Sequence, residues 1–294
     1  MKTIFRYTPK DSLLFIQPLM IFAITLGIAI VDPALHWWFI AAIFQWWLSV
    51  NVLNSSLHHH AHWPTFINGT ANRVYELFLS AMTGKQLHSW KVAHVKHHVH
   101  INDKPVNGKT KDPVSVYACG KNGERELFWS FIFNKANWQL IALFKQEQNF
   151  AVPRVDQWFK QETLAIRVWL LSLLIINPVY GLFIFGLNYI VTLGDAATSY
   201  GEHWGVLERR GDTTQDSIGI YSKWYNIIGF NAGYHQEHHH QPSLHWSRLP
   251  EITKDMHPSR KIVGGMHILN NPFWGDLKLT FKPSSSSSTE KSSL

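Results

Sequence analysis

The most constraining feature of the sequence is a pair of long apolar segments near its start. Residues 12–31 carry no charge, and residues 34–57 contain His36 as their one titratable side chain. At ~1.5 Å per residue, twenty helical residues cross a hydrocarbon layer of ~30 Å. Asp32-Pro33 lies between the segments and is typical of a tight turn. We therefore predict a hairpin of two membrane-spanning helices, whereas a cleavable signal peptide would be shorter and stand alone.

A second apolar pair lies in the last third of the chain. It spans about residues 164–176 and 179–194, and Asn177-Pro178 separates its two members. The first member is short for a membrane span and contains Arg167, whose long side chain we expect to extend to the membrane–water interface. The pattern predicts a second hairpin, and four membrane-spanning helices in all.

The distribution of basic residues predicts the orientation of these hairpins. Of the 27 Lys and Arg residues, three precede residue 11, thirteen lie between residues 58 and 163, and ten follow residue 200. Neither predicted hairpin turn carries one. Basic residues are enriched in cytoplasmic loops, so we expect a multi-pass protein with both termini and the long middle loop in the cytoplasm. This placement accounts for the basic balance without a nucleic-acid partner.

Cysteine content limits the redox chemistry that the chain can carry. Cys119 is the single cysteine, which excludes an internal disulfide framework, a cysteine-rich zinc module and an iron–sulfur cluster. Any electrons must come from outside the chain. We expect one membrane domain over residues 1–282 and a disordered serine-rich tail over residues 283–294.

Fifteen of the 18 histidines fall in four places, all predicted to be cytoplasmic. The first histidine segment is residues 58–62, the second is residues 88–100 and the third is residues 235–245; His203 stands alone at the end of the fourth apolar stretch. Residues at i, i+3 and i+4 project from one helix face. That spacing selects nine candidate metal ligands, which are His58, His62, His94, His97, His98, His203, His235, His238 and His239.

Nine imidazoles are too many for one metal ion and enough for two. Imidazole suits iron, zinc, copper or nickel, so spacing alone leaves the metal open. We expect five other histidines of these segments to form hydrogen bonds or face solvent, namely His59, His60, His100, His240 and His245. His36, His257 and His267 have no expected role. A histidine-rich metal transporter is the alternative, but it should carry ionisable residues at the bilayer midplane, which the predicted spans lack.

The histidine pattern and its flanking residues resemble the membrane fatty acid desaturase/hydroxylase superfamily, over about residues 12–252. Trp90, His94, His97, His98 and Asn102 are similar to the second histidine motif of that superfamily, and the run from Tyr234 to Pro250 is similar to the third. The segments around Glu202-His203 and Asp112-Pro113 resemble the alkane hydroxylase branch. Ser199 departs from the acyl-CoA desaturases, which have an asparagine at the corresponding position.

The resemblance implies an all-α integral membrane fold in which a cytoplasmic helical cap carries a histidine-rich dimetal site. It implies two iron ions, with O2 as co-substrate, that oxidise a C–H bond of a fatty acyl or lipid chain. Desaturation is the favoured outcome, and hydroxylation by a monooxygenase-type reaction is the alternative. Glu202, Asp103 and Glu237 are candidate acceptors for the N–H groups of ligand imidazoles.

The resemblance also implies an external electron carrier of the ferredoxin, rubredoxin or cytochrome b5 type. Basic residues around the second histidine segment offer a complementary surface for an acidic carrier. The predicted docking residues are Lys85, Lys91, Lys96, Lys104, Lys109 and Lys111. Contact with anionic lipid head groups is the alternative role for these lysines.

Overall fold

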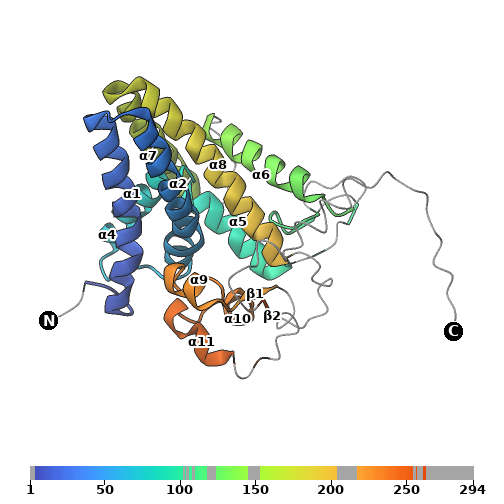
Figure 1. Cartoon of the computed structure of the whole chain (residues 1–294). Coiled ribbons are helices and arrows are strands. Elements are labelled where there is room, and N and C mark those ends of the chain that lie inside the picture. Colours follow the sequence, from blue (N-terminus) through green and yellow to red (C-terminus); the bar gives the residue numbers. More distant parts are fainter. Residues whose placement is uncertain are drawn as a thin grey trace, which may run out of the picture.

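The computed structural model describes residues 4–101, 103, 106–107, 110–117, 124–144, 153–203, 217–253, 256 and 261–262. Within these residues the fold is mostly helical, as predicted. Four long helices form its body: α1 (Ser12–Val31), α2 (Leu35–Val52), α7 (Pro153–Ile176) and α8 (Pro178–His203) (Figure 1). Two helical segments of the described chain, Pro9–Val31 and Pro178–His203, are long and apolar enough to cross a membrane.

The helix boundaries match the first predicted segment and correct the other three. The predicted segment 12–31 coincides with α1. The segment 34–57 is shorter as an α-helix, because its last five residues, Leu53–Leu57, form a π-helical turn. Both later segments are longer than predicted: α7 starts at residue 153 and α8 continues to residue 203. Hydropathy missed these extensions because their side chains are polar and pair within the protein.

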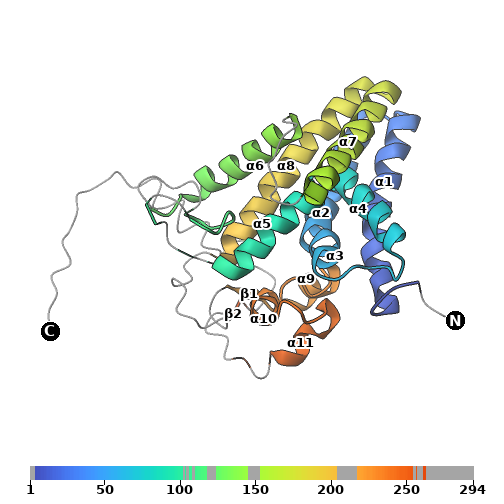
Figure 2. The same ribbon diagram turned by 180° about the vertical axis from the view of Figure 1, so that it is seen from behind.

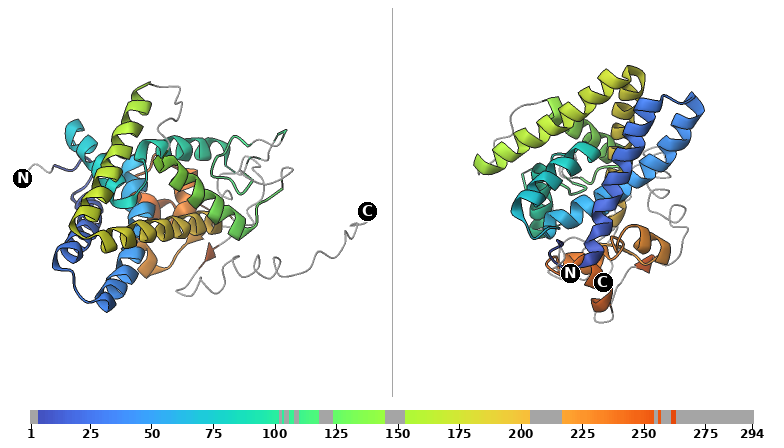
Figure 3. Two further views of the ribbon diagram at one scale, coloured as in Figure 1. Left: turned by 90° about the horizontal axis from the view of Figure 1, so that it is seen from above. Right: turned by 90° about the vertical axis from the view of Figure 1, so that its left-hand side faces the viewer.

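The two hairpin turns meet at one end of the molecule. The side-chain amide of Asn177, between α7 and α8, donates a hydrogen bond of 2.8 Å to the Asp32 carboxylate, between α1 and α2. Near these turns Ala29, Leu173 and Tyr180 belong to one buried apolar cluster. The two hairpins therefore pack side by side with their turns at the same end (Figure 3).

Shorter helices pack against the hairpins. They are α4 (Gly69–Thr83), α5 (Leu87–His100) and α6 (Phe128–Phe144). The helix α4 contacts α7, and α6 runs along α8. The guanidinium of Arg167 of α7 donates two hydrogen bonds, of 2.8 and 3.2 Å, to the Leu143 carbonyl. This arrangement satisfies a carbonyl at the C-terminal end of α6 and places positive charge where the helix dipole favours it.

The C-terminal part covers the end of the bundle opposite the hairpin turns. It contains α9 (Lys223–Ile228), α10 (His235–His240), the 3₁₀ turn Trp246–Arg248 and α11 (Leu249–Ile252). The strands β1 (Gly219–Ile220) and β2 (Lys261–Ile262) pair in parallel and are the described exception to the all-α prediction. Figures 1 and 2 show these elements beside α3 (His58–His62) and the end of α5.

Candidate metal centre

The first histidine segment follows directly from the π-helical turn. α3 is a single short helix, and it places His58 and His62 on one face because they are four residues apart. Two other histidines of the segment point elsewhere. His59 contacts the Phe230 carbonyl at 3.0 Å through Nε2, and the Nδ1 atom of His60 lies 2.8 Å from the Thr65 hydroxyl.

The other candidate ligands come from α5, α8 and α10. α5 carries His94, His97 and His98 with the spacing predicted from the sequence. His203 is the last residue of α8, and α10 carries the candidate ligands of the third segment. Since α3, α5, α10 and the end of α8 converge, histidines separated by up to 180 residues become neighbours (Figure 2).

Five of the imidazoles form a first set, which we call the five-imidazole set. The Nε2 atom of His238 lies 2.9 Å from that of His58 and 3.0 Å from that of His98. The Nε2 atom of His94 lies 3.0 Å from those of both His98 and His62. All five rings therefore aim the same nitrogen at a common point.

The remaining four imidazoles form a second set, the four-imidazole set. The Nε2 atom of His203 lies 3.1 Å from that of His97 and 3.2 Å from that of His235. His239 completes the set, with its Nε2 atom 3.0 Å from that of His235. The rings of His98 and His239, one from each set, have centroids 4.5 Å apart, so the two sets adjoin.

Hydrogen bonding among the imidazoles cannot satisfy this arrangement. A neutral imidazole nitrogen carries either one proton or one lone pair, and each points in a single direction. In the five-imidazole set three of the Nε2 atoms have two close nitrogen neighbours. A bound cation, by contrast, requires converging lone pairs. In two groups of these histidines the ligand nitrogens all lie within 4.8 Å of one another: His58, His62, His94 and His238 in one group, and His97, His203 and His239 in the other.

Burial favours the neutral form of several of these imidazoles, which is the form that binds metals. It lowers the pKa of His62 to about 4, with nearby Lys91 acting in the same direction. Burial, followed by repulsion from His62, His97 and His203, lowers the pKa of His98 to about 2. The pKa values of His94, His235, His238 and His239 are also well below the usual range, first because of burial and then because of the other histidines.

Asp112 is the carboxylate that supports a candidate ligand directly. It is fully buried, and its Oδ2 atom accepts a hydrogen bond of 2.9 Å from Nδ1 of His97. Burial alone would raise the pKa of Asp112, but the hydrogen bond and charge interaction with His97 bring it below its usual value. In the sequence, Asp112 stands out only as part of the segment that resembles the alkane hydroxylases, and no contact with an imidazole was predicted for it.

The three carboxylates predicted to accept from ligand imidazoles make other contacts among the described residues. Asp103 is partly exposed and contacts His100 at 3.2 Å. Glu237 is fully buried, and its Oε1 atom accepts hydrogen bonds from Tyr221 and Thr253. Glu202 reaches His235, but at 3.6 Å from Nε2, the nitrogen that faces the other imidazoles, rather than from Nδ1. Chain position suggested proximity for all three, but not direction.

The histidines expected to lie outside the ligand sets are placed in other contacts. His100 pairs with Asp103, and His245 lies 3.3 Å from Asp11. His240 lies outside both groups with metal-ligand spacing, and His36 stacks beside Trp37. His257, His267, Cys119, Lys104, Lys109 and the predicted tail 283–294 lie outside the described residues.

A further titratable cluster forms an ion-pair network. Glu76, His88 and Glu162 have metal-ligand spacing. The Arg73 guanidinium already occupies this site, however, donating to Glu162 at 2.7 Å and to Glu76 at 2.9 Å. The amide and ring of His88 also contact the Glu162 carboxylate. The network therefore joins α4, α5 and α7 through a buried carboxylate that is already compensated.

Comparison with known proteins identifies the family. The family model described as fatty acid desaturase matches residues 35–264, a range that includes all nine candidate ligands. No curated protein and no solved structure matches the chain significantly. The family model covers 230 of the 294 residues. The chain therefore belongs to the fatty acid desaturase family.

Proposed function

We propose that the protein is an O2-dependent diiron oxidoreductase that desaturates a fatty acyl or lipid chain. Family membership implies an oxidoreductase with a lipid substrate in a membrane setting. The observation that carries the proposal is the convergence of nine Nε2 atoms, from imidazoles that are buried or half-buried, into two adjoining sets.

The number and spacing of these atoms argue against a four-coordinate structural zinc site. Two nitrogens that each lie ~2.1 Å from a metal are about 3.0 Å apart at a right angle and about 3.4 Å apart at the tetrahedral angle. The observed separations of 2.9–3.2 Å therefore favour a shell of more than four ligands. Structural zinc sites almost always have four. In our proposal the five-imidazole set holds one iron ion and the four-imidazole set the other.

The residues of the chain position the reaction and exclude water from it. When bound, the metal pair supplies the reduction of O2 that drives removal of hydrogen from the substrate. Asp112 holds the proton on Nδ1 of His97 and thereby directs Nε2 of that ring into the site. Candidate ligands that are only 2–7% exposed, such as His97 and His94, leave little room for bulk water.

We propose that the two hairpins span the membrane four times, with both turns on the side opposite the histidines. The hydrogen bond between Asn177 and Asp32 supports a common side for the turns. The outward faces of the helices support contact with lipid, because large apolar side chains are exposed there, among them Ile43 of α2, Ile175 of α7 and Leu182 of α8. The positive-inside rule places the histidine end and both termini in the cytoplasm.

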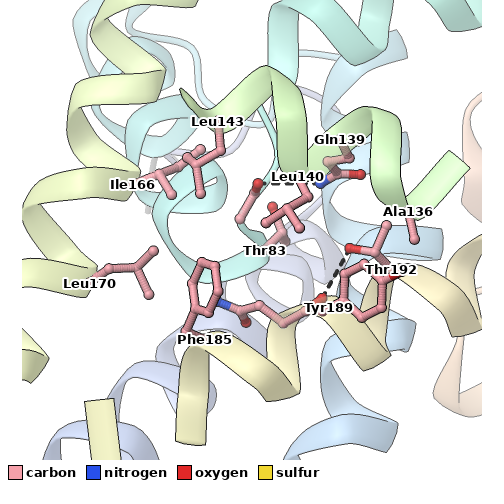
Figure 4. Close-up of a pocket in the computed structure, with 12 residues that line it drawn as sticks. Thr83, Ala136, Gln139, Leu140, Leu143, Ile166, Leu170, Phe185, Tyr189 and Thr192 are labelled. Carbon is pink, nitrogen blue, oxygen red and sulfur yellow. Dashed lines mark hydrogen bonds between the residues drawn. The ribbon is translucent and has the colours of Figure 1, made fainter. Parts of the chain in front are cut away.

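An apolar pocket supports binding of an alkyl chain between the helices. It lies between α6, α7 and α8 and is closed on one side by the end of α4 (Figure 4). Leu140, Leu143, Ile166, Leu170 and Phe185 supply most of its apolar lining. We propose that part of the substrate chain lies here, along α8, whose other end carries His203.

The electrons would come from an acidic one-electron carrier of the ferredoxin, rubredoxin or cytochrome b5 type. Lys85 is removed from the predicted docking surface, because it is 6% exposed and pairs with Asp195. Lys96 and Lys111 are exposed, and Lys91 is half-buried. Turnover at sub-saturating carrier should fall when salt rises and when Lys96 and Lys111 are replaced by Glu. Unchanged turnover in that variant would place the docking surface elsewhere.

A comparative lipid profile tests the proposed reaction. Fatty acids from cells with and without the protein are compared by mass spectrometry, with an inactive His94→Ala variant as the control. Desaturation removes two hydrogens from the chain and, with O2, two electrons and two protons, forms two waters. Hydroxylation adds one oxygen atom to the chain and forms one water. A product heavier by one oxygen would establish the alternative, and the absence of either change across lipid classes would oppose an oxidoreductase.

A further inference from the structure

A buried polar cluster near the first residues of α1 connects the first histidine segment to the third. Pro18 has no backbone N–H, so the carbonyl of Leu14, four residues earlier, has no donor within the helix. Two side chains from other elements take this place. The hydroxyls of Ser56 and Tyr75 each donate to the Leu14 carbonyl at 2.7 Å. The proline thus creates an acceptor that anchors the π-helical turn and α4 to α1.

Gln17, the neighbour of Pro18, makes the connection to the third segment. Its Oε1 atom accepts hydrogen bonds from the hydroxyls of Ser55 at 3.0 Å and Ser56 at 3.3 Å. Its Nε2 atom donates at 3.1 Å to the carbonyl of Ile228, the last residue of α9. Gln17 is 7% exposed, and both Ser55 and Ser56 are fully buried. The side-chain amide of Gln17 therefore links the turn that directly precedes His58 to Ile228, in the segment that leads to His235.

The π-helical turn makes this connection matter for the histidines. A π-helical turn adds a residue relative to α-helical register, and such turns are frequent at functional sites. The turn Leu53–Leu57 lies between α2 and α3. Its shape therefore sets the direction of α3 relative to α2, and with it the direction in which His58 and His62 project. Ser55 and Ser56 lie inside the turn, and their hydrogen bonds to α1 hold it in place.

We propose that Gln17 is a positioning residue that fixes the first histidine segment relative to the third. The inference rests on the proposed dimetal centre. Within the residues that the structure describes, Gln17 has no hydrogen bond to a histidine; it acts through Ser55, Ser56 and Ile228. The five-imidazole set depends on this alignment, because it combines His58 and His62 with His238.

The four-imidazole set is independent of the first segment. Its members come from α5, α8 and α10. The third segment also has supports other than Gln17, since Tyr221 and Thr253 hold Glu237 of α10, and the Asn226 side chain accepts from the Gly233 amide. Loss of Gln17 should therefore disturb one metal site and spare the other. His59 contributes a second link to Phe230, so the expected effect is weakening rather than loss.

The test is a Co²⁺ titration of the full-length, metal-free protein in detergent, followed by visible absorption. Wild type should bind two ions per chain. Gln17→Met keeps the side-chain length and removes all three hydrogen bonds of the side-chain amide. We expect affinity at one site to fall about 10–100-fold, the usual range for a lost outer contact, with the other site unchanged. Ser55→Ala removes the shorter of the two serine hydrogen bonds to Gln17. It should weaken the same site to a smaller extent, which keeps the inference testable if Gln17→Met folds poorly.

Gln45→Met is the matched control. Gln45 is 4% exposed and donates to Thr25 across α1 and α2 at 2.6 Å, so its loss removes a comparable buried amide without a link to a histidine segment. Gln17→Met and Ser55→Ala variants that bind both ions as the control does would overturn the inference and leave the dimetal centre intact. Equal weakening of both sites would also overturn it. A wild-type protein that binds no metal would instead refute the dimetal centre, and the inference with it.

Discussion

Replacing Asp112 with Asn should weaken metal binding at the four-imidazole set. Both carboxylate oxygens are used: Oδ2 accepts from Nδ1 of His97 at 2.9 Å, and Oδ1 accepts from the Val114 amide at 2.9 Å. The side-chain amide in the Asp112→Asn variant would have one oxygen and one NH2 group for two donors. In either orientation of the amide, one donor therefore faces another donor.

The size of the effect follows from these contacts. A hydrogen bond to a charged group contributes about 1.5–3 kcal/mol, and a tenfold change in affinity corresponds to about 1.4 kcal/mol. Asp112→Asn should therefore reduce metal affinity by roughly 10–100-fold at the site that contains His97. The five-imidazole set contains no ring held by Asp112, so its affinity should stay unchanged.

The assay is the two-site metal titration of purified protein, with Asp103→Asn as the matched control. Asp103 also contacts a histidine, but His100 belongs to neither set and the pair is partly exposed. The control should bind both ions as wild type does. Two unchanged sites in Asp112→Asn would show that Asp112 does not orient a ligand, and the reasoning from its hydrogen bond would be refuted. Weakening at the other site would contradict the assignment of His97.

Four further outcomes are expected. Alanine at His94, His97, His235 or His239 should abolish substrate oxidation measured by lipid mass spectrometry, whereas His100→Ala should retain it. Arg73→Met leaves the fully buried Glu162 carboxylate without its cation and should lower the free energy of unfolding by about 3 kcal/mol, measured by thermal unfolding. Arg248→Met removes one partner of an exposed ion pair and should change the free energy of unfolding little. The pKa of His62 is about 4 in the folded protein and about 6.5 in the unfolded chain, so below pH 6.5 the unfolded chain binds more protons. The free energy of unfolding of the metal-free protein should therefore fall by about 2 kcal/mol between pH 7 and pH 5 because of this residue. The His62→Gln variant should lack this part of the pH dependence. Accessibility tags at either terminus or near Lys121 should report one side of the membrane, and tags at Asp32-Pro33 or Asn177-Pro178 should report the other side. Opposite locations for the Lys121 and C-terminal tags would rule out a single cytoplasmic histidine site.

The sequence by itself determined the class of the protein and the residue types of its site. Uncharged stretches predicted the membrane helices because a long apolar run has few other stable environments. Spacing of i, i+3 and i+4 predicted which histidines share a helix face, since this is a local property of the backbone. The family resemblance covered the same residues, and the family model confirms it.

Tertiary structure decided the properties that depend on direction and on distant partners. The sequence suggested Asp103, Glu202 and Glu237 as partners of ligand histidines and missed Asp112, because only packing determines which oxygen meets which nitrogen. Arg167 was expected to reach the membrane interface and Lys85 to contribute to a docking surface, and the structure gives each a partner from another helix. Their roles could not be predicted because a charged side chain takes its function from the group that packing brings to it.

The division of nine imidazoles into sets of five and four is the clearest case of this kind. Periodicity within one helix cannot show that His238 joins the first and second segments while His239, its neighbour in the chain, joins His203 and His97. Adjacent residues on a helix diverge by about 100°, so α10 faces both sets at once. The sequence supplied the ligands, and the crossing of α3, α5, α8 and α10 decided which of them meet.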